Sequence, residues 1–172
     1  MLLLFAALCL LQVHSSSADI QVYIDDADCV FAHPKYVSYC DVGVDYVNET
    51  TNAIHVDFEL IEDSPRGTMA NFEVLLDIGG DNFVSTGMQM EMPLKDMAAE
   101  PIGAGPLMNC LSCTNDEPTC KKGKHTCNDY FPSADELPSS LPNGRYKAMI
   151  RLYEGEEMFL KAITFAQVQT EF

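Results

Sequence analysis

Cysteine is the residue type whose spacing in this chain most directly predicts a chemistry. The 172 residues include seven cysteines, and six of them follow an apolar amino-terminal segment. The last four are spaced C-x2-C-x6-C-x6-C, whereas a zinc ribbon would repeat the spacing of its first pair in its second. An even number of cysteines in an exported chain predicts disulfides instead. The six cysteines are Cys29, Cys40, Cys110, Cys113, Cys120 and Cys127.

Distance along the chain limits how these cysteines pair. Cys29 and Cys40 enclose a turn-containing segment of ten residues, which suits a local disulfide. The other four lie within an 18-residue stretch rich in Asn, Lys, Pro and Gly. Two more bonds are expected there, and spacing alone leaves their pairing open. The arrangement that we prefer is nested: Cys110 with Cys127, and Cys113 with Cys120.

The chain contains residue types that could catalyse a reaction or bind a metal, but they lack the spacing that catalysis or metal binding needs. There is no G-x-S-x-G sequence, no glycine-rich phosphate loop and no H-E-x-x-H sequence. His33, His55 and His125 are scattered, and four aspartates lack the spacing and the glycine of a calcium-binding loop, which favours a solvated acidic segment. We therefore expect no enzyme activity, no metal site and no cofactor. The four aspartates are Asp25, Asp26, Asp28 and Asp41.

One basic segment interrupts an otherwise acidic chain. The formal charge of the chain is −16, which makes nucleic acid an unsuitable partner. Lys121, Lys122 and Lys124 lie beside His125 inside the cysteine-rich loop. They suit an anionic sugar, a phosphate headgroup or an acidic partner surface, and a solvated loop is the alternative. Four nearby apolar residues are expected to form a cavity rim or membrane-touching lip, or to pack under the loop. They are Tyr130, Phe131, Leu137 and Leu141.

The first 18 residues are predicted to be a signal peptide. Leu2–Leu11 is an apolar run broken by one cysteine, and it is too short to span a bilayer, which needs about 20 residues. Small residues suit cleavage after Ala18. The remaining residues, 19–172, are enough for one domain in a secreted or luminal protein. Asn48 begins the sequon Asn-Glu-Thr, which predicts an N-glycan on an exported chain.

Alternation between apolar and polar residues predicts β-strands through most of the chain. The segments 55–60, 71–78 and 87–92 each alternate, and a glycine-containing turn at residues 79–82 separates the last two. Helical periodicity is confined to one turn at residues 94–99. Short strands with turn signals predict an all-β fold of two antiparallel sheets. Apolar side chains aligned on one face include Phe58, Leu60, Phe72, Val74, Leu76, Met88, Met90 and Met92.

A predicted β-hairpin near the carboxyl terminus organises the rest of the fold. Residues 145–153 and 158–168 alternate, and residues 154–157 form a short polar turn between them. The basic residues of the first strand share one face, so the sheet has one wet side. The opposite face, which we expect to be buried, carries Tyr146, Ala148, Ile150 and Leu152.

This hairpin and the residues before it resemble a known family. The sequence reads Glu-Leu-Pro-Ser, then a leucine two residues later, a glycine three residues after that, and Gly-x-Tyr at the start of the strand. The order is similar to the closing hairpin of the ML lipid-recognition domains, and most similar to that of the GM2 ganglioside activator group. The match covers about 35 residues, roughly a fifth of the chain. The matching residues are Glu136, Leu137, Pro138, Ser139, Leu141, Gly144 and Tyr146.

The resemblance implies an immunoglobulin-like sandwich whose two sheets open into a lipid-binding cup. It implies a secreted or lysosomal protein that extracts, presents or transfers an amphiphilic lipid or glycolipid without making a bond. A lysosomal glycosidase or a cell-surface receptor would be its protein partner, and its contact with membranes would be transient. The aligned apolar residues would line the cavity, and methionine, which occurs nine times, adapts to apolar ligands of varied shape.

The chain departs from that family at one cysteine, and a second class of function stays open. In members of the activator group, a disulfide joins an amino-terminal cysteine to a cysteine in the last strand. In this chain, Leu160 and Lys161 occupy the positions where that second cysteine is expected. Cys29 therefore needs another partner. The alternative function is an extracellular signalling or receptor-adaptor module with a small lipid cavity or none.

Overall fold

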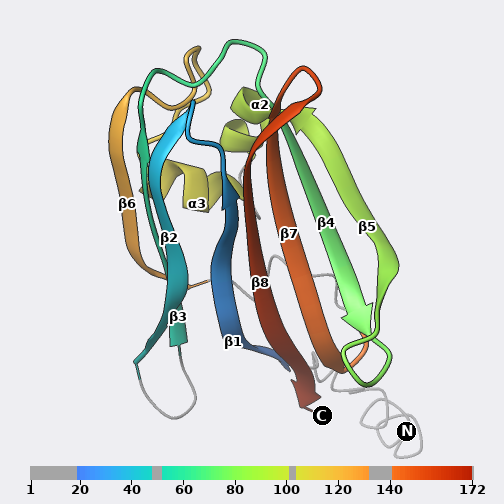
Figure 1. Cartoon of the computed structure of the whole chain (residues 1–172). Helices are drawn as coiled ribbons and strands as arrows, with labels where there is room; N and C mark the ends of the chain where they lie inside the picture. Colours follow the sequence, from blue (N-terminus) through green and yellow to red (C-terminus); the bar gives the residue numbers. More distant parts are fainter. Residues whose placement is uncertain (1–18, 48–51, 101–103, 132–140, 172) are drawn as a thin grey trace, which may run out of the picture.

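The computed structural model of the protein describes residues 19–47, 52–100, 104–131 and 141–171, which form two antiparallel β-sheets (Figure 1). The predicted all-β sandwich is therefore confirmed. The larger sheet has the spatial order β1 (Asp19–Ala32), β8 (Glu157–Glu171), β7 (Gly144–Glu154), β4 (Met69–Asp77) and β5 (Phe83–Pro93). The smaller sheet has the order β2 (Val37–Tyr46), β3 (Asn52–Leu60) and β6 (Gly123–Tyr130). Two short helices, α2 (Leu94–Ala99) and α3 (Ala104–Cys110), follow β5.

The strands and turns that the sequence predicts occur close to the expected positions. β7 and β8 form the hairpin, and Glu154 pairs with Glu157 across its turn. Gly155 in that turn has a φ of 59°, which glycine adopts without strain. The helical turn expected at residues 94–99 is α2. Ile78, expected at the end of a strand, lies just past β4 and is exposed.

The sequence analysis does not predict β1, β2 or β6. Of the four aspartates expected in a solvated acidic segment, Asp41 lies in β2 and the other three lie in β1, where two register shifts interrupt the alternation that would have revealed a strand. Asp26 and Asp28 are exposed on that strand, as expected of solvated groups. The second half of the cysteine-rich stretch, expected to be a loop, is β6. Its buried positions are filled by His125 and Cys127, which do not mark a strand as clearly as branched apolar residues do.

The two sheets are joined along one edge, where β1 lies beside β2 (Figure 1). The Cys29–Cys40 disulfide links these two strands. Asn52 of β3 is buried there; its Oδ1 accepts a hydrogen bond from the Ile24 N–H at 3.0 Å, and its Nδ2 donates to the Ile24 carbonyl. β1 is an edge strand, so half of its backbone groups have no strand to pair with. The Asn52 amide supplies the missing partners at Ile24.

All three predicted disulfides are confirmed, including the nested pair. Cys110–Cys127 ties the end of α3 to β6, and Cys113–Cys120 closes the loop between them. In the last strand, Ala162 is the residue opposite Cys29, so β8 offers it no sulfur. Three disulfides are typical of a protein that folds in an oxidising, secretory compartment. Among the described residues, none of the helices has the length and apolar character needed to cross a membrane.

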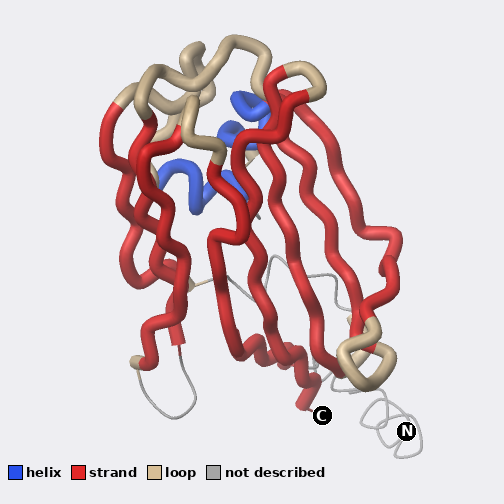
Figure 2. The backbone as a smooth tube through the Cα atoms, in the orientation of Figure 1, coloured by secondary structure: helices blue, strands red, loops and turns tan. Residues whose placement is uncertain are grey.

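The hydrophobic core is concentrated at one end of the sandwich, which we call the helical end. Figure 2 shows both helices and most of the loops gathered there. The main cluster of buried residues joins α2, α3 and the disulfide loop to both sheets. A second cluster, formed by Ile24, Ala27, Val42 and Ile54, lies between β1 and the small sheet. We call the opposite end, where β2 leads to β3 and β4 turns into β5, the distal end.

Replacing Asn52 tests whether its amide holds the sheets together. The change Asn52→Ala leaves the Ile24 N–H and carbonyl without their partners, and an unsatisfied buried group costs about 1–3 kcal/mol. We expect the free energy of unfolding, measured by urea denaturation, to fall by at least that amount. Asn71→Ala on β4 is the control, because the side-chain partners of Asn71, Arg151 and Glu91, are accessible to water. Equal losses in both variants would contradict this role.

Candidate functional site

The inner face of the large sheet carries most of the residues that the sequence marks as a ligand cavity. The register of β5, β4 and β7 aligns them in rows across the three strands. Val84 and Ala70, which the sequence analysis does not select, lie in the same rows. From the distal end to the helical end, the rows are Val84, Leu76 and Tyr146; Val74 and Ala148; Met90, Phe72 and Ile150; Met92, Ala70 and Leu152.

The rows nearest the helical end belong to the packed interior. Ala70 is completely buried, and Met92 and Leu152 beside it pack against the main cluster. Phe72 and Ile150, one row away, also contact that cluster and remain partly accessible. These five residues form the boundary between the core and the rest of the inner face.

The remaining residues of this face form what we call the inner apolar patch: Val74, Leu76, Val84, Met88, Met90 and Ala148. None of the six belongs to either hydrophobic cluster of the described residues. Val74, Leu76 and Ala148 are only half-buried, and Met90 and Val84 expose 40% and 39% of their surface. The patch is therefore an apolar surface on the inside of the sandwich that the described core leaves partly uncovered.

A bulge in β5 separates Met88 from the regular ladder. Leu75 pairs with Ser85 and Glu73 pairs with Gln89, so three residues of β5 lie opposite one residue of β4. Gly87 takes a φ of 80° there, in the left-handed region that favours glycine. Met88 is half-buried within this bulge. The expected straight alignment of three methionines therefore holds for two of them.

Tyr146 lies at the distal border of the patch and is held in place by its hydroxyl. The side chain is buried, and its O–H donates to the Pro142 carbonyl at 2.7 Å. Burial raises the pKa of Tyr146 above its ordinary value. The phenol is therefore neutral at physiological pH, and its ring presents an uncharged surface next to Leu76.

Phe58 and Leu60, also selected as cavity residues, lie in the main core at the helical end. The Phe58 ring stacks on His125 beneath the disulfide loop. The structure thus separates these two residues from the inner apolar patch, because they belong to β3 of the small sheet and are already covered.

The basic segment is divided by the alternation of β6. Lys124 lies on the outer face of the small sheet, where its Nζ is 2.8 Å from Asp57 Oδ2. This hydrogen bond, together with one from Thr126, holds the pKa of Asp57 below its ordinary value, and the carboxylate in turn raises the pKa of Lys124. His125 points to the opposite face and is buried. The four basic residues therefore do not form a single patch.

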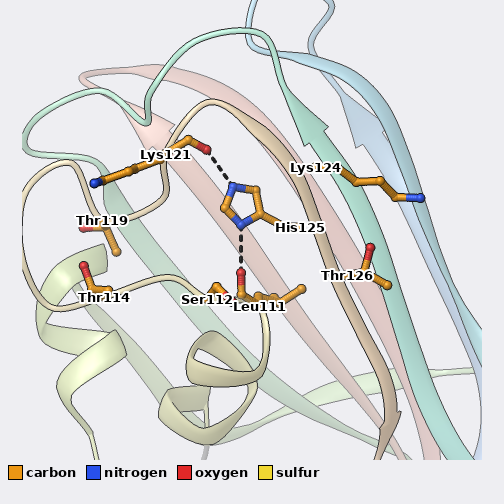
Figure 3. Close-up of a pocket in the computed structure, with 8 residues that line it drawn as sticks. All are labelled: Leu111, Ser112, Thr114, Thr119, Lys121, Lys124, His125 and Thr126. Carbon is orange, nitrogen blue, oxygen red and sulfur yellow. Dashed lines mark hydrogen bonds between the residues drawn. The ribbon is translucent and has the colours of Figure 1, made fainter.

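A pocket of ≈ 370 Å³ lies where the disulfide loop meets β6 (Figure 3). Its lining includes four hydroxyl side chains and His125. In Figure 3 the Lys121 and Lys124 side chains point away from each other on either side of the pocket. The residues that line it are Leu111, Ser112, Thr114, Thr119, Lys121, Lys124, His125 and Thr126.

The residues expected to form a rim lie at two different ends of the molecule. Lys121 and Lys122 precede β6 at the helical end, whereas Tyr130 and Phe131 stand at the other end of that strand. Leu141 is described just before β7, also at the distal end. Tyr130 packs against both hydrophobic clusters, and Phe131 is exposed. The predictions for Leu137, the glycan at Asn48 and the signal peptide fall outside the described residues.

The distal end carries exposed apolar residues that the sequence analysis does not select. Tyr46 and Ile78 expose 69% and 61% of their surface, and Val47 and Phe131 are also exposed. They belong to three separate connections: the end of β2, the β4–β5 turn and the end of β6. The sequence signal that could have revealed these residues is an apolar side chain directly before or after a turn, because turns are usually polar.

The two other histidines of the described residues each lie beside carboxylates. His55 lies between Asp41 and Asp45, at 3.5 and 3.2 Å, on the outer face of the small sheet. His33 lies 3.6 Å from Glu157 at the helical end. Within the described ranges, no three His, Cys, Asp or Glu side chains gather in a way that could hold a metal ion.

Comparisons of the sequence with protein families and curated proteins find no relative. No protein-family model matches the chain, and a search of curated proteins finds no similar sequence. The function therefore has to be argued from the inner apolar patch, the distal end and the hairpin.

Removing the Lys124 charge tests whether Lys124 stabilises the fold through its ion pair with Asp57. The lowered pKa of Asp57 means that its ion pair adds stability above the ordinary value of 3.8, and that this stability is lost as the pH falls through the lowered pKa. Lys124→Met should therefore lower the thermal midpoint at pH 6, by an amount that shrinks as the solution is acidified below pH 3.8. Lys122→Met, which leaves Asp57 paired, is the control and should show no such trend. A pH-independent difference would show that Lys124 acts by packing.

Proposed function

We propose that this protein is a non-covalent lipid carrier that binds the acyl chains of an amphiphilic lipid or glycolipid against the inner apolar patch. The observation that carries the proposal is the partial exposure of six apolar side chains on the inside of a sandwich. Leaving apolar surface in water costs about 25 cal/mol for each Å², and contiguous patches of this kind mark ligand or partner sites. An acyl chain is a ligand that would cover them.

Because the two sheets are attached along one edge, they can leave room for an acyl chain away from that edge. Two sheets packed face to face lie about 10 Å apart, and their side chains fill the space. Here the small sheet contacts the large one mainly through β1, and β4 and β5 are the strands farthest from that edge (Figure 1). The row through Ala148 continues with Thr164 in β8 and Ala27 in β1. Ala27 packs in the second cluster at the joined edge, whereas Ala148 and Thr164 are small side chains in the middle of the sheet.

The sequence supports the same proposal independently of the patch. The closing hairpin resembles that of the ML lipid-recognition domains, whose members bind lipids between two antiparallel sheets. The methionines of β5 are flexible side chains that adapt to apolar ligands. The predicted signal peptide and the three disulfides suit a secreted or lysosomal protein that meets membrane lipids outside the cytosol.

We further propose that the distal end makes the transient membrane contact through which lipid enters and leaves. Tyr46, Val47, Ile78 and Phe131 are exposed apolar side chains at that end, and the inner apolar patch extends towards it. The formal charge of −16 opposes contact with anionic membranes at neutral pH. An acidic lumen lowers this charge by protonating carboxylates, so the contact should strengthen there.

Enlarging one side chain of the patch tests the lipid site. In a close-packed core, Ala148→Phe would strain the fold by about 1–3 kcal/mol. In an open site it should leave the thermal midpoint of delipidated protein nearly unchanged while displacing part of the acyl chain. Each displaced methylene costs about 0.8 kcal/mol, so losing two weakens binding of a fluorescent fatty-acyl probe more than tenfold.

The matched control for Ala148→Phe is Gln89→Phe, which adds the same ring to the exposed outer face of β5. It should leave the affinity for the probe unchanged. The lipid proposal fails if the wild-type protein shows no saturable binding of the probe and Ala148→Phe lowers the thermal midpoint strongly. A closed interior of that kind would favour the extracellular interaction module, as would purified protein from which organic solvent extracts no lipid.

A charge at the distal end tests the membrane contact. Ile78→Asp places a carboxylate on the exposed β4–β5 turn, and we expect it to reduce sedimentation of the protein with vesicles of anionic and zwitterionic lipid at pH 5. Ile61→Asp makes the same change at the helical end, where Ile61 is also exposed, and should bind vesicles like the wild type. Equal losses in both variants would show that total charge, rather than the distal end, governs membrane contact.

A further inference from the structure

His125 lies between two backbone carbonyl groups at the helical end of the molecule (Figure 3). Its Nδ1 is 2.7 Å from the Leu111 carbonyl oxygen, and its Nε2 is 2.6 Å from the Lys121 carbonyl oxygen. A carbonyl oxygen only accepts hydrogen bonds, so both ring nitrogens must carry a proton for both bonds to form. A neutral ring carries one proton and turns a nitrogen lone pair towards the other oxygen, which is repulsive at this distance.

The surroundings of His125 fix the ring in this position. The residue is only 7% exposed. Its ring stacks on Phe58 with the centroids 4.9 Å apart and 18° between the planes. Nδ1 also lies 3.9 Å from the Cys113 Sγ atom, in the disulfide that closes the loop. Rotating the ring out of its plane would break the stacking on Phe58.

Some groups near the His125 ring favour its protonated form, and others disfavour it. Burial disfavours an imidazolium, and Lys121 and Lys124 border the same pocket. The charge of Lys124 is matched by Asp57 at 2.8 Å, and the Asp63 carboxylate accepts a hydrogen bond from the Lys122 N–H beside the pocket. Two carbonyl oxygens that each receive a charge-assisted hydrogen bond favour the imidazolium. The carboxyl end of α3, just before the first of these carbonyls, adds a favourable partial charge.

We propose that protonation of His125 closes a clamp on the disulfide loop, residues 111–122, and so shapes the pocket that this loop borders. Leu111 begins the loop and Lys121 lies near its end, so the imidazolium ties both ends of the loop to β6. Loss of the proton converts one of the two ties into a repulsive contact and releases that side of the loop. The clamp therefore closes as the pH falls and weakens as the pH rises.

The clamp is independent of the inner apolar patch. His125 and the pocket lie at the helical end, under the disulfide loop, whereas the patch lies on β4, β5 and β7 towards the distal end. Loss of lipid binding would therefore leave the clamp intact, and a protein without the clamp would still present the patch. The two proposals fail or succeed in separate experiments.

Two measurements on the folded, disulfide-bonded protein test the clamp. Nitrogen-15 NMR of the wild-type histidine rings should show a proton on both nitrogens of His125 at pH 5.5. Hydrogen exchange of the backbone amides in residues 112–122, normalised to the intrinsic rate at each pH, should be slower at pH 5.5 than at pH 7.5. A charge-assisted hydrogen bond corresponds to a factor of roughly ten in protection.

Variants separate His125 from the other histidines. His125→Gln offers one amide donor and one acceptor, so it satisfies one carbonyl at any pH, and the loop should lose its pH-dependent protection. His55→Gln removes a histidine from the outer face of the small sheet and should keep that dependence. The proposal is overturned by a single proton on the His125 ring at pH 5.5, or by equal loop protection at both pH values. The NMR measurement needs no variant, so it decides the question even where His125→Gln fails to fold.

Discussion

The architecture depends on how β1, an edge strand of the large sheet, is attached to the small sheet. Three kinds of contact act at this edge: the Cys29–Cys40 disulfide, the Asn52 amide on the backbone of Ile24, and a cluster of apolar side chains. The disulfide and the hydrogen bonds are directional, so they set the angle between the sheets as well as their distance. No comparable link joins β5 to β6 among the described residues.

This one-sided attachment explains which side chains are buried. Residues of the large sheet reach the core where they lie near β1 or beneath α2 and α3, and the inner residues of β4 and β5 that lie farther away remain partly exposed. It also separates two surfaces of different chemistry. The apolar surface extends to the distal end, whereas the hydroxyl-lined pocket and His125 are confined to the helical end. The proposed lipid contact and the proposed protonation of His125 therefore belong to different parts of one small sandwich.

The sequence predicts local structure well where one physical signal dominates. Strict alternation located β3, β4, β7 and β8, and cysteine spacing predicted two disulfides between residues 110 and 127, whose preferred nested pairing the structure shows. The prediction missed β1 because its bulges change the register of the alternation, and it missed β6 because a histidine and a disulfide cysteine occupy the buried positions. Residue type alone could not show that Phe58 belongs to the core while Met90 lies on an open face. That difference arises from the distance of each strand from the joined edge.

The strand order of the large sheet has a consequence for how the protein is made. β7 and β8 follow the other described strands along the chain and insert between β1 and β4. A nascent chain that ends before Gly144 therefore has two strands whose apolar inner faces and backbone edges await partners that do not yet exist. Unpaired edges of this kind invite association with other chains. β1 and β4 would have to be shielded until the β7–β8 hairpin is complete, and a chain truncated within that hairpin would be prone to aggregation.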